Sequence, residues 1–471
     1  MMSALLEKID LFNNKFSFLF PILLAILLFG QIFFSIIYHY LDISRPALLV
    51  APVLAVLLLA RFFKDGKEFR PTWIDICMGA FFAFILISLI MHGQYSHQLF
   101  FKNYIGFMAF PFMAGRLLNK NELKAFVFTV LFLTIAAAII VSFELIFIPA
   151  DEYNQDRIST LFWNYDPNYY GGIPTNTFAG FALAPLLILL HCPIFKIRDS
   201  KFFWMKATLI FLCVWVLLII ATRSTILSGL LFSAVAIVFF NYNNIKVLLR
   251  QAVLLISAIL FALVMMPQVR TDFLLSGYNQ LVNVVKKQDE YDLGDIEKVK
   301  PAAVPAQEEI PRSGVPKLNT FLPDINCTSN CNSISARYYL SLSALKIFEE
   351  NPVFGIGANN YVVYTGESSQ RLLPHNLTLH IFLELGVVGG GLYLFVVCGL
   401  IFYFSRGFVH KQRNQENNII DTAFLLWGSI LIIEQFSGNY FVTYQFYAMT
   451  GILISAYQRA LMNKQEILQN A

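Results

Sequence analysis

The chain has 471 residues, of which 57% are apolar and only 14% are charged, and its mean hydropathy is +0.62. Soluble domains carry about 25% charged residues, so this composition excludes an ordinary soluble protein and predicts one embedded in a membrane. The formal net charge of +4 is small and gives no indication of nucleic-acid binding.

Membrane-spanning helices are the elements that the hydrophobic pattern predicts. A hydrocarbon core about 30 Å thick needs roughly 20 apolar helical residues. Twelve runs of this kind predict an all-α polytopic membrane protein, and the polar break "ATRST" must divide the seventh run from the eighth. The runs cover approximately residues 16–37, 46–63, 72–91, 99–118, 123–149, 174–191, 207–221, 224–240, 247–266, 376–404, 420–438 and 441–461.

The distribution of Lys and Arg predicts the orientation of these spans. With both termini in the cytoplasm, 20 of the 34 Lys and Arg residues lie on the cytoplasmic side, as the positive-inside rule requires. The short outer loops then hold only Arg45, Lys102, Arg157 and Arg223. The other ten lie in one long outer segment, 267–375, whose length exempts it from the rule.

This orientation divides the chain into three parts. Residues 1–266 carry helices 1 to 9, residues 267–375 form a large outer loop, and residues 376–471 carry helices 10 to 12 and a cytoplasmic tail. In the loop, "CTSNC" places Cys327 and Cys331 close together, and an oxidising compartment would favour a local disulfide between them.

The end of the outer loop predicts an amphipathic helix over about residues 335–350. Ser335 can cap this helix, and apolar side chains then recur at helical spacing up to Phe348. Asn351 and Pro352 should end the helix, and "GIGANN" should form a turn. Such a helix is expected on the membrane surface or on top of the bundle.

Polar residues beside or within the apolar runs are the candidates for function. Arg223 can bind an anion in a cavity through its planar guanidinium group, or it can reach lipid headgroups instead. His375 lies at the outer entry to the tenth span. Glu384 lies roughly 13 Å further along the helix, where a carboxylate must be paired, protonated or in an aqueous cavity. The following Gly386, Gly389, Gly390 and Gly391 are expected to allow close helix packing.

Three stretches carry a resemblance to a known family. The sequence "HNLTLHIFLELGVVGG" is His-Asn, nine residues and Gly-x-x-Gly, which resembles the signature of the O-antigen ligase and Wzy-type polymerase superfamily. "ARYYLSLSALKIFEENPVFGIGANNY" and "IIATRSTILSGLL" are similar to two further segments of that family. Gly390 departs from the Thr or Ser that ligases often carry, which weakens the choice of ligase over polymerase.

The resemblance implies a GT-C-like enzyme of the bacterial inner membrane, with its long loop in the periplasm. It would move a glycan from undecaprenyl pyrophosphate to an acceptor hydroxyl, with inversion and without a metal or another cofactor. The acceptor is lipid A–core for a ligase and another lipid-linked repeat unit for a polymerase.

The resemblance and the physical arguments together assign site residues. His375 is the expected general base, because a mostly neutral histidine can accept the proton of a sugar hydroxyl. Arg223, Arg337 and Asn376 are the expected residues for binding the pyrophosphate or the glycan. Further candidates are Lys102, Arg157, Arg270, Arg371 and Glu384.

Two alternatives stay open. A polymerase would use the same donor chemistry with another acceptor. A transporter or flippase for a lipid-linked sugar would also fit twelve spans, although the sequence shows no convincing internal repeat of the kind that transporters often have.

Overall fold

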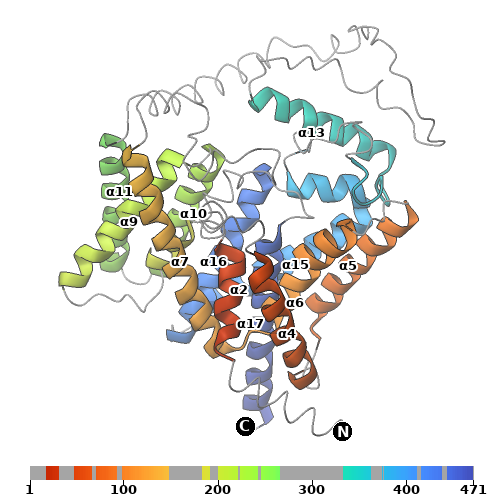
Figure 1. Cartoon of the computed structure of the whole chain (residues 1–471), viewed down its shortest axis with the longest axis horizontal. Coiled ribbons are helices and arrows are strands. Elements are labelled where there is room, and N and C mark those ends of the chain that lie inside the picture. Colours follow the sequence, from red (N-terminus) through yellow and green to blue (C-terminus); the bar gives the residue numbers. More distant parts are fainter. Residues whose placement is uncertain are drawn as a thin grey trace.

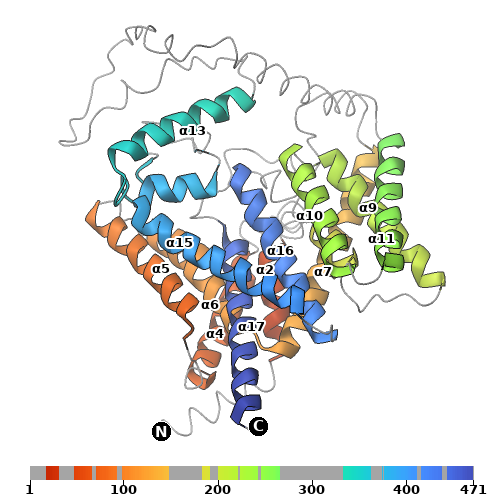
Figure 2. The same ribbon diagram turned by 180° about the vertical axis from the view of Figure 1, so that it is seen from behind.

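The structure is a computed structural model, and its described part is mostly helix and contains no β-strand (Figures 1 and 2). This confirms the all-α prediction for that part. The described residues are 17–30, 47–65, 71–92, 98–147, 183–190, 200–220, 223–241, 245–265, 333–361, 374, 376–410, 415–437 and 443–469.

The helices follow the predicted apolar runs. The first group consists of α2 (Leu19–Phe29), α4 (Ala47–Asp65), α5 (Trp73–Met91), the π-helix η1 (Gln98–Ala109), α6 (Phe110–Arg116) and α7 (Lys120–Phe147). The second group consists of α9 (Ser200–Ile220), α10 (Arg223–Asn241), α11 (Ile245–Val264), α13 (Ser333–Glu350), α15 (Leu377–His410), α16 (Gln415–Ser437) and α17 (Tyr444–Gln469). The polar break at 221–225 therefore separates α9 from α10.

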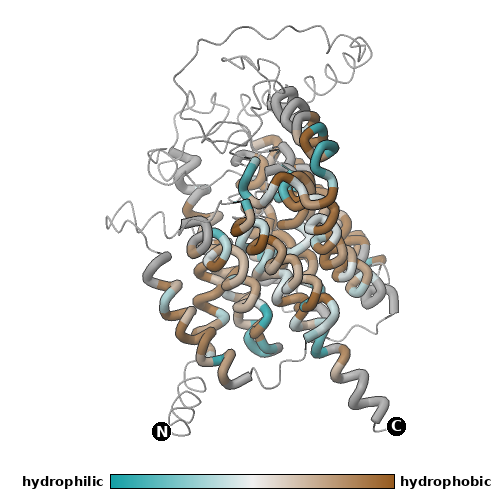
Figure 3. Tube along the Cα trace, turned by 90° about the vertical axis from the view of Figure 1, so that its right-hand side faces the viewer, coloured by the Kyte–Doolittle hydropathy of each residue, from teal (hydrophilic) through white to brown (hydrophobic). Residues whose placement is uncertain are grey.

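In the part of the chain that the structure describes, four helices are long and apolar enough to cross a membrane by themselves. They cover Trp73–Met91, Asn121–Ile140, Ile245–Val264 and Leu377–Ser405. Shorter apolar helices cover Leu19–Phe29, Val50–Phe63 and Phe203–Leu218. Figure 3 shows hydrophobic residues along most of the bundle. These findings support a membrane protein, while the total of twelve spans stays a prediction.

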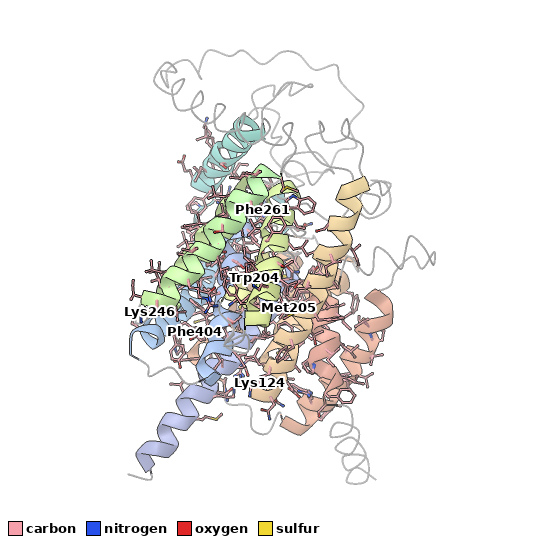
Figure 4. All side chains as sticks on the ribbon, turned by 90° about the vertical axis from the view of Figure 1, so that its left-hand side faces the viewer. Lys124, Trp204, Met205, Lys246, Phe261 and Phe404 are labelled. Atoms are coloured by element: carbon pink, nitrogen blue, oxygen red, sulfur yellow. The ribbon has the colours of Figure 1, made fainter. Side chains whose placement is uncertain are left out.

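One end of the bundle lies under α13, and we call it the α13 end. In Figure 4, Phe261 in the last turn of α11 lies nearer to α13 than Lys246 at the start of that helix does. Helix α11 therefore runs toward the α13 end. Because only three residues separate α10 from α11, α10 runs the opposite way and begins at the α13 end with Arg223.

Buried ion pairs hold the opposite end of the bundle together. Arg61 on α4 pairs with Glu122 on α7, and Arg116 on α6 binds Asp75 on α5 at 2.8 Å. All four side chains are less than a tenth exposed. Charges in such apolar surroundings are tolerated when they are paired, so these contacts join α4 to α7 and α5 to α6.

Helix α15 differs from the single continuous span predicted over 376–404. Gly386 has φ 64° and ψ −165°, which breaks the helix between Leu385 and Val387. This backbone region is accessible almost only to glycine. The predicted packing role fits Gly389 better, because a Cβ atom there would lie 3.2 Å from the ring of Phe84 on α5.

Replacing Gly386 by alanine should destabilise the fold. The new methyl group would collide with the carbonyl of Val353, and the backbone region itself costs about 1–3 kcal/mol for a residue with a side chain. We expect Gly386→Ala to lower the free energy of unfolding in mixed detergent micelles by at least about 2 kcal/mol. The matched control is Gly391→Ala, where nothing lies within 4 Å of the added methyl group; equal stability of the two variants would contradict the assigned break.

Candidate functional site

The break in α15 is filled by the turn that follows α13. We call residues 351–361 the NP turn. In an unbroken helix, the N–H groups of Val387 and Val388 would bind the carbonyls of Leu383 and Glu384. Here those N–H groups donate instead to the carbonyls of Pro352 (2.8 Å) and Val353 (3.2 Å).

The NP turn also supplies donors for the two carbonyls that the break releases. Ile356 N donates to Leu383 O at 3.1 Å, and Gly357 N donates to Glu384 O at 2.9 Å. The two donors and two acceptors lost from α15 are therefore all regained from one turn. This exchange fixes the NP turn, and with it the end of α13, against the break in α15.

Glu384 adds a side-chain anchor to this backbone exchange. Its carboxylate is buried and accepts hydrogen bonds from Asn359 N at 2.6 Å and from Tyr361 N at 3.0 Å. His380 Nε2 lies 3.3 Å from the same carboxylate, one helical turn back. The buried carboxylate predicted at this depth is thus paired, and it holds the second half of the NP turn.

Helix α5 contacts the NP turn from another direction. Ser88 Oγ accepts a hydrogen bond from Ala358 N at 2.9 Å, and the Ser88 carbonyl lies 2.9 Å from His92 Nδ1. A side chain at Gly357 would collide with the ring of His92, where the Cβ–ring distance would be 2.5 Å. Ser88 and His92 were missed in the sequence analysis because one serine and one histidine near the end of an apolar helix carry no pattern.

Asn376 begins α15 as its N-cap. Its Oδ1 accepts a hydrogen bond from Leu379 N at 2.8 Å, and its carbonyl accepts one from His380 N at 2.9 Å. The Thr378 hydroxyl donates to Gln435 Oε1 on α16 at 2.8 Å. The start of α15 is therefore fixed by its own cap and by a neighbouring helix.

The structure brings the backbones of several predicted site residues to the α13 end. Arg223 is the first residue of α10, Arg337 lies in α13, and Asn376 caps α15. Lys102 lies in η1. His375, which is bonded to Asn376, lies outside the described residues, and so do Arg157, Arg270, Arg371, Cys327 and Cys331.

Anion binding by Arg223 and Arg337 stays a prediction. Arg223 stands at a helix N-terminus, where unpaired N–H groups and the helix dipole also favour negative charge. An arginine guanidinium group can in general offer two donors to a phosphate. In the described part of the chain, no three His, Cys, Asp or Glu side chains are grouped as metal ligands would be.

Removing the Glu384 carboxylate should weaken the whole assembly. In Glu384→Ala, the N–H groups of Asn359 and Tyr361 lose their acceptors, and an unsatisfied buried donor costs about 1–3 kcal/mol. We expect the free energy of unfolding to fall by about 2–6 kcal/mol. Glu349→Ala, at an exposed site on α13, should change it by less than about 0.5 kcal/mol; similar losses in both variants would disprove the anchoring role.

Comparison with known proteins identifies the part of the chain that carries these features. A model of the O-antigen ligase family matches residues 208–394. This range starts in α9 and ends in α15, so it contains Arg223, Arg337, His375, the NP turn and the break at Gly386. Searches of curated proteins and of solved structures gave no match. Residues 208–394, which include the motifs noted in the sequence, are therefore similar to the O-antigen ligase family.

Proposed function

We propose that the protein is a ligase-type glycosyltransferase that moves a glycan from undecaprenyl pyrophosphate to a hydroxyl group of lipid A–core. The observation that carries this proposal is the O-antigen ligase match over residues 208–394. In that range, α13 packs against α15, and α10 begins with Arg223 toward the same end of the bundle. The membrane composition of the chain supports a lipid-linked donor.

The donor determines what the protein must supply. A sugar 1-pyrophosphate already contains a good leaving group, so the enzyme has to stabilise the negative charge that grows on the pyrophosphate. In this proposal Arg223 and Arg337 bind that group through charge-assisted hydrogen bonds. Lys102, Arg157, Arg270 and Arg371 are further cations that can contribute.

The acceptor hydroxyl must lose a proton as it attacks. His375 takes that proton as general base, since an imidazole is mostly neutral near pH 7. Asn376 supports the base by capping α15 beside it, and Glu384 acts from a distance by anchoring the NP turn. In-line attack at the anomeric carbon inverts its configuration, and the proposal needs neither a metal nor another cofactor.

The proposed setting is the bacterial inner membrane. Both termini lie in the cytoplasm, the α13 end faces the periplasm, and residues 267–375 form the periplasmic loop between the helices of 1–266 and those of 376–471. Cys327 and Cys331 would form a disulfide in that compartment. The positive-inside distribution of Lys and Arg supports this orientation.

Gly390 favours no acceptor by itself. A Cβ atom at this position would lie 2.7 Å from the ring of Phe382, so packing alone accounts for the absence of Thr or Ser. A polymerase that joins lipid-linked repeat units is therefore the second candidate, distinguished by experiment.

Substitution of the proposed base and of one arginine tests the chemistry. With purified protein, a lipid-linked donor and lipid A–core, His375→Ala should slow glycan transfer by at least about 100-fold. Arg223→Ala should slow it by about 100- to 1,000-fold. Arg250→Ala is the matched control because Arg250 lies near the start of α11, away from the α13 end, and packs on Phe203. Full activity of the His375 and Arg223 variants would refute the mechanism.

Loss of the protein from its cell distinguishes the candidate functions. A ligase predicts bare lipid A–core at the surface, with polymer stored on the lipid carrier. A polymerase predicts core that carries a single repeat unit. Electrophoresis of surface lipopolysaccharide, combined with extraction of lipid-linked glycans, separates these outcomes, and accumulation of donor on the cytoplasmic face without either pattern would indicate a flippase.

A further inference from the structure

The NP turn presents two apolar side chains outward. Val353 and Phe354 are 52% and 62% exposed, although backbone bonds on both sides of them hold the turn in place. The ring of Phe354 stacks on that of Phe84 of α5, with the centroids 6.3 Å apart. These two side chains are therefore exposed on a turn that is itself held firmly in place.

The exposed tip continues an apolar stripe on α5. Phe84, Ile87 and Met91 share one side of that helix, at spacings of three and four residues. Ile87 is 53% exposed and Met91 is 77% exposed. Since Trp73–Met91 is one of the candidate membrane spans, this stripe is part of the surface that faces lipid.

The contact with Phe84 places the tip beside the span rather than beyond it. Seven residues separate Phe84 from Met91, which corresponds to about 10 Å along the helix axis. The tip thus reaches the level of apolar residues well inside the end of α5. Glu349 and Glu350, which close α13 just before the turn, are exposed and charged, so a boundary between polar and apolar surroundings lies within a few residues.

The second part of the NP turn, residues 355–361, satisfies its backbone N–H groups inside the protein. Every N–H group from Gly355 to Tyr361 donates a hydrogen bond within the protein. The acceptors include the carbonyls of Leu383 and Glu384, the carboxylate of Glu384 and the hydroxyl of Ser88. Non-helical backbone is tolerated at membrane depth where it is buried in protein, and these seven N–H groups all have protein acceptors.

We propose that the NP turn is a re-entrant element whose tip, Val353 and Phe354, contacts the acyl chains of membrane phospholipids next to α5. The contact buries apolar surface of both side chains, as interfacial segments do. It also fixes the depth of the break in α15, because Val353 O and Pro352 O bind the N–H groups of Val388 and Val387. This proposal concerns the position of the turn in the bilayer and does not depend on glycan transfer.

Nitroxide labels at chosen sites test the proposal. Single cysteines replace Phe354, Ile87 or Lys346 in a full-length chain whose six native cysteines are changed to serine or alanine. Each labelled protein is reconstituted in vesicles of phosphatidylethanolamine and phosphatidylglycerol. Collision rates with oxygen, which concentrates in lipid, and with a water-soluble nickel chelate are then measured by electron paramagnetic resonance. Ile87 is the lipid-facing control, and Lys346, exposed on α13, is the water-facing control.

The expected result is an oxygen-to-nickel ratio at 354 that matches the ratio at 87 and is several-fold higher than that at 346. A ratio at 354 equal to that at 346 would overturn the proposal and place the turn in water. Low collision rates with both reagents would overturn it too, in favour of a protein partner or a second copy of the chain. A parallel label at Val353 keeps the test decisive if the Phe354 variant fails to reconstitute.

Discussion

The exchange of hydrogen bonds between the NP turn and the broken helix α15 is the interaction on which the rest of the site depends. A helix that is interrupted in apolar surroundings leaves two donors and two acceptors unsatisfied, and each would be costly there. The NP turn takes all four through Pro352, Val353, Ile356 and Gly357. Neither the turn nor the break is therefore stable without the other, and α13 is carried to its place by this shared structure.

Several buried charged groups of the described chain have structural partners. Arg61 with Glu122 and Arg116 with Asp75 are paired and buried at the end of the bundle away from α13, where they hold neighbouring helices together. Glu384 is paired as well, but with backbone N–H groups and His380. Structural pairing explains these groups without any substrate.

Much of the fold could be predicted because the pattern of apolar residues sets helix positions directly. The break between α9 and α10 falls at "ATRST", and α13 covers the stretch expected to be amphipathic. The break at Gly386 could not be predicted in the same way. A glycine within an apolar helix usually indicates close packing against another helix. Its position depends on Pro352 and Val353, more than thirty residues earlier, whose carbonyls replace the lost helical partners.

The candidate site was predicted less completely, for a related reason. The distribution of Lys and Arg predicted Arg223 on the outer side, where the long loop lies, and the direction of α10 agrees by placing Arg223 toward the α13 end. Glu384 was recognised as a carboxylate that needed a partner, yet the partners are backbone N–H groups of Asn359 and Tyr361, which leave no mark in the sequence. Ser88 binds the same turn, and His92 contacts Ser88. Neither residue could be predicted, because a single polar residue forms no periodic pattern in the sequence.

The break in α15 also affects where the start of α15 lies relative to a lipid-linked substrate. The segment Leu377–Leu385 is only nine residues long, about 13 Å, so its first turn cannot lie far from the NP turn. If the tip of that turn is in hydrocarbon, the start of α15 is held within a short, fixed distance of the headgroup region, where a pyrophosphate on a lipid carrier must lie. A continuous helix could slide or tilt along its axis with little change in its contacts. A helix that is broken at Gly386 and bonded to the NP turn cannot slide in this way. A base next to Asn376 would need this restraint in order to reach a donor anchored in the bilayer.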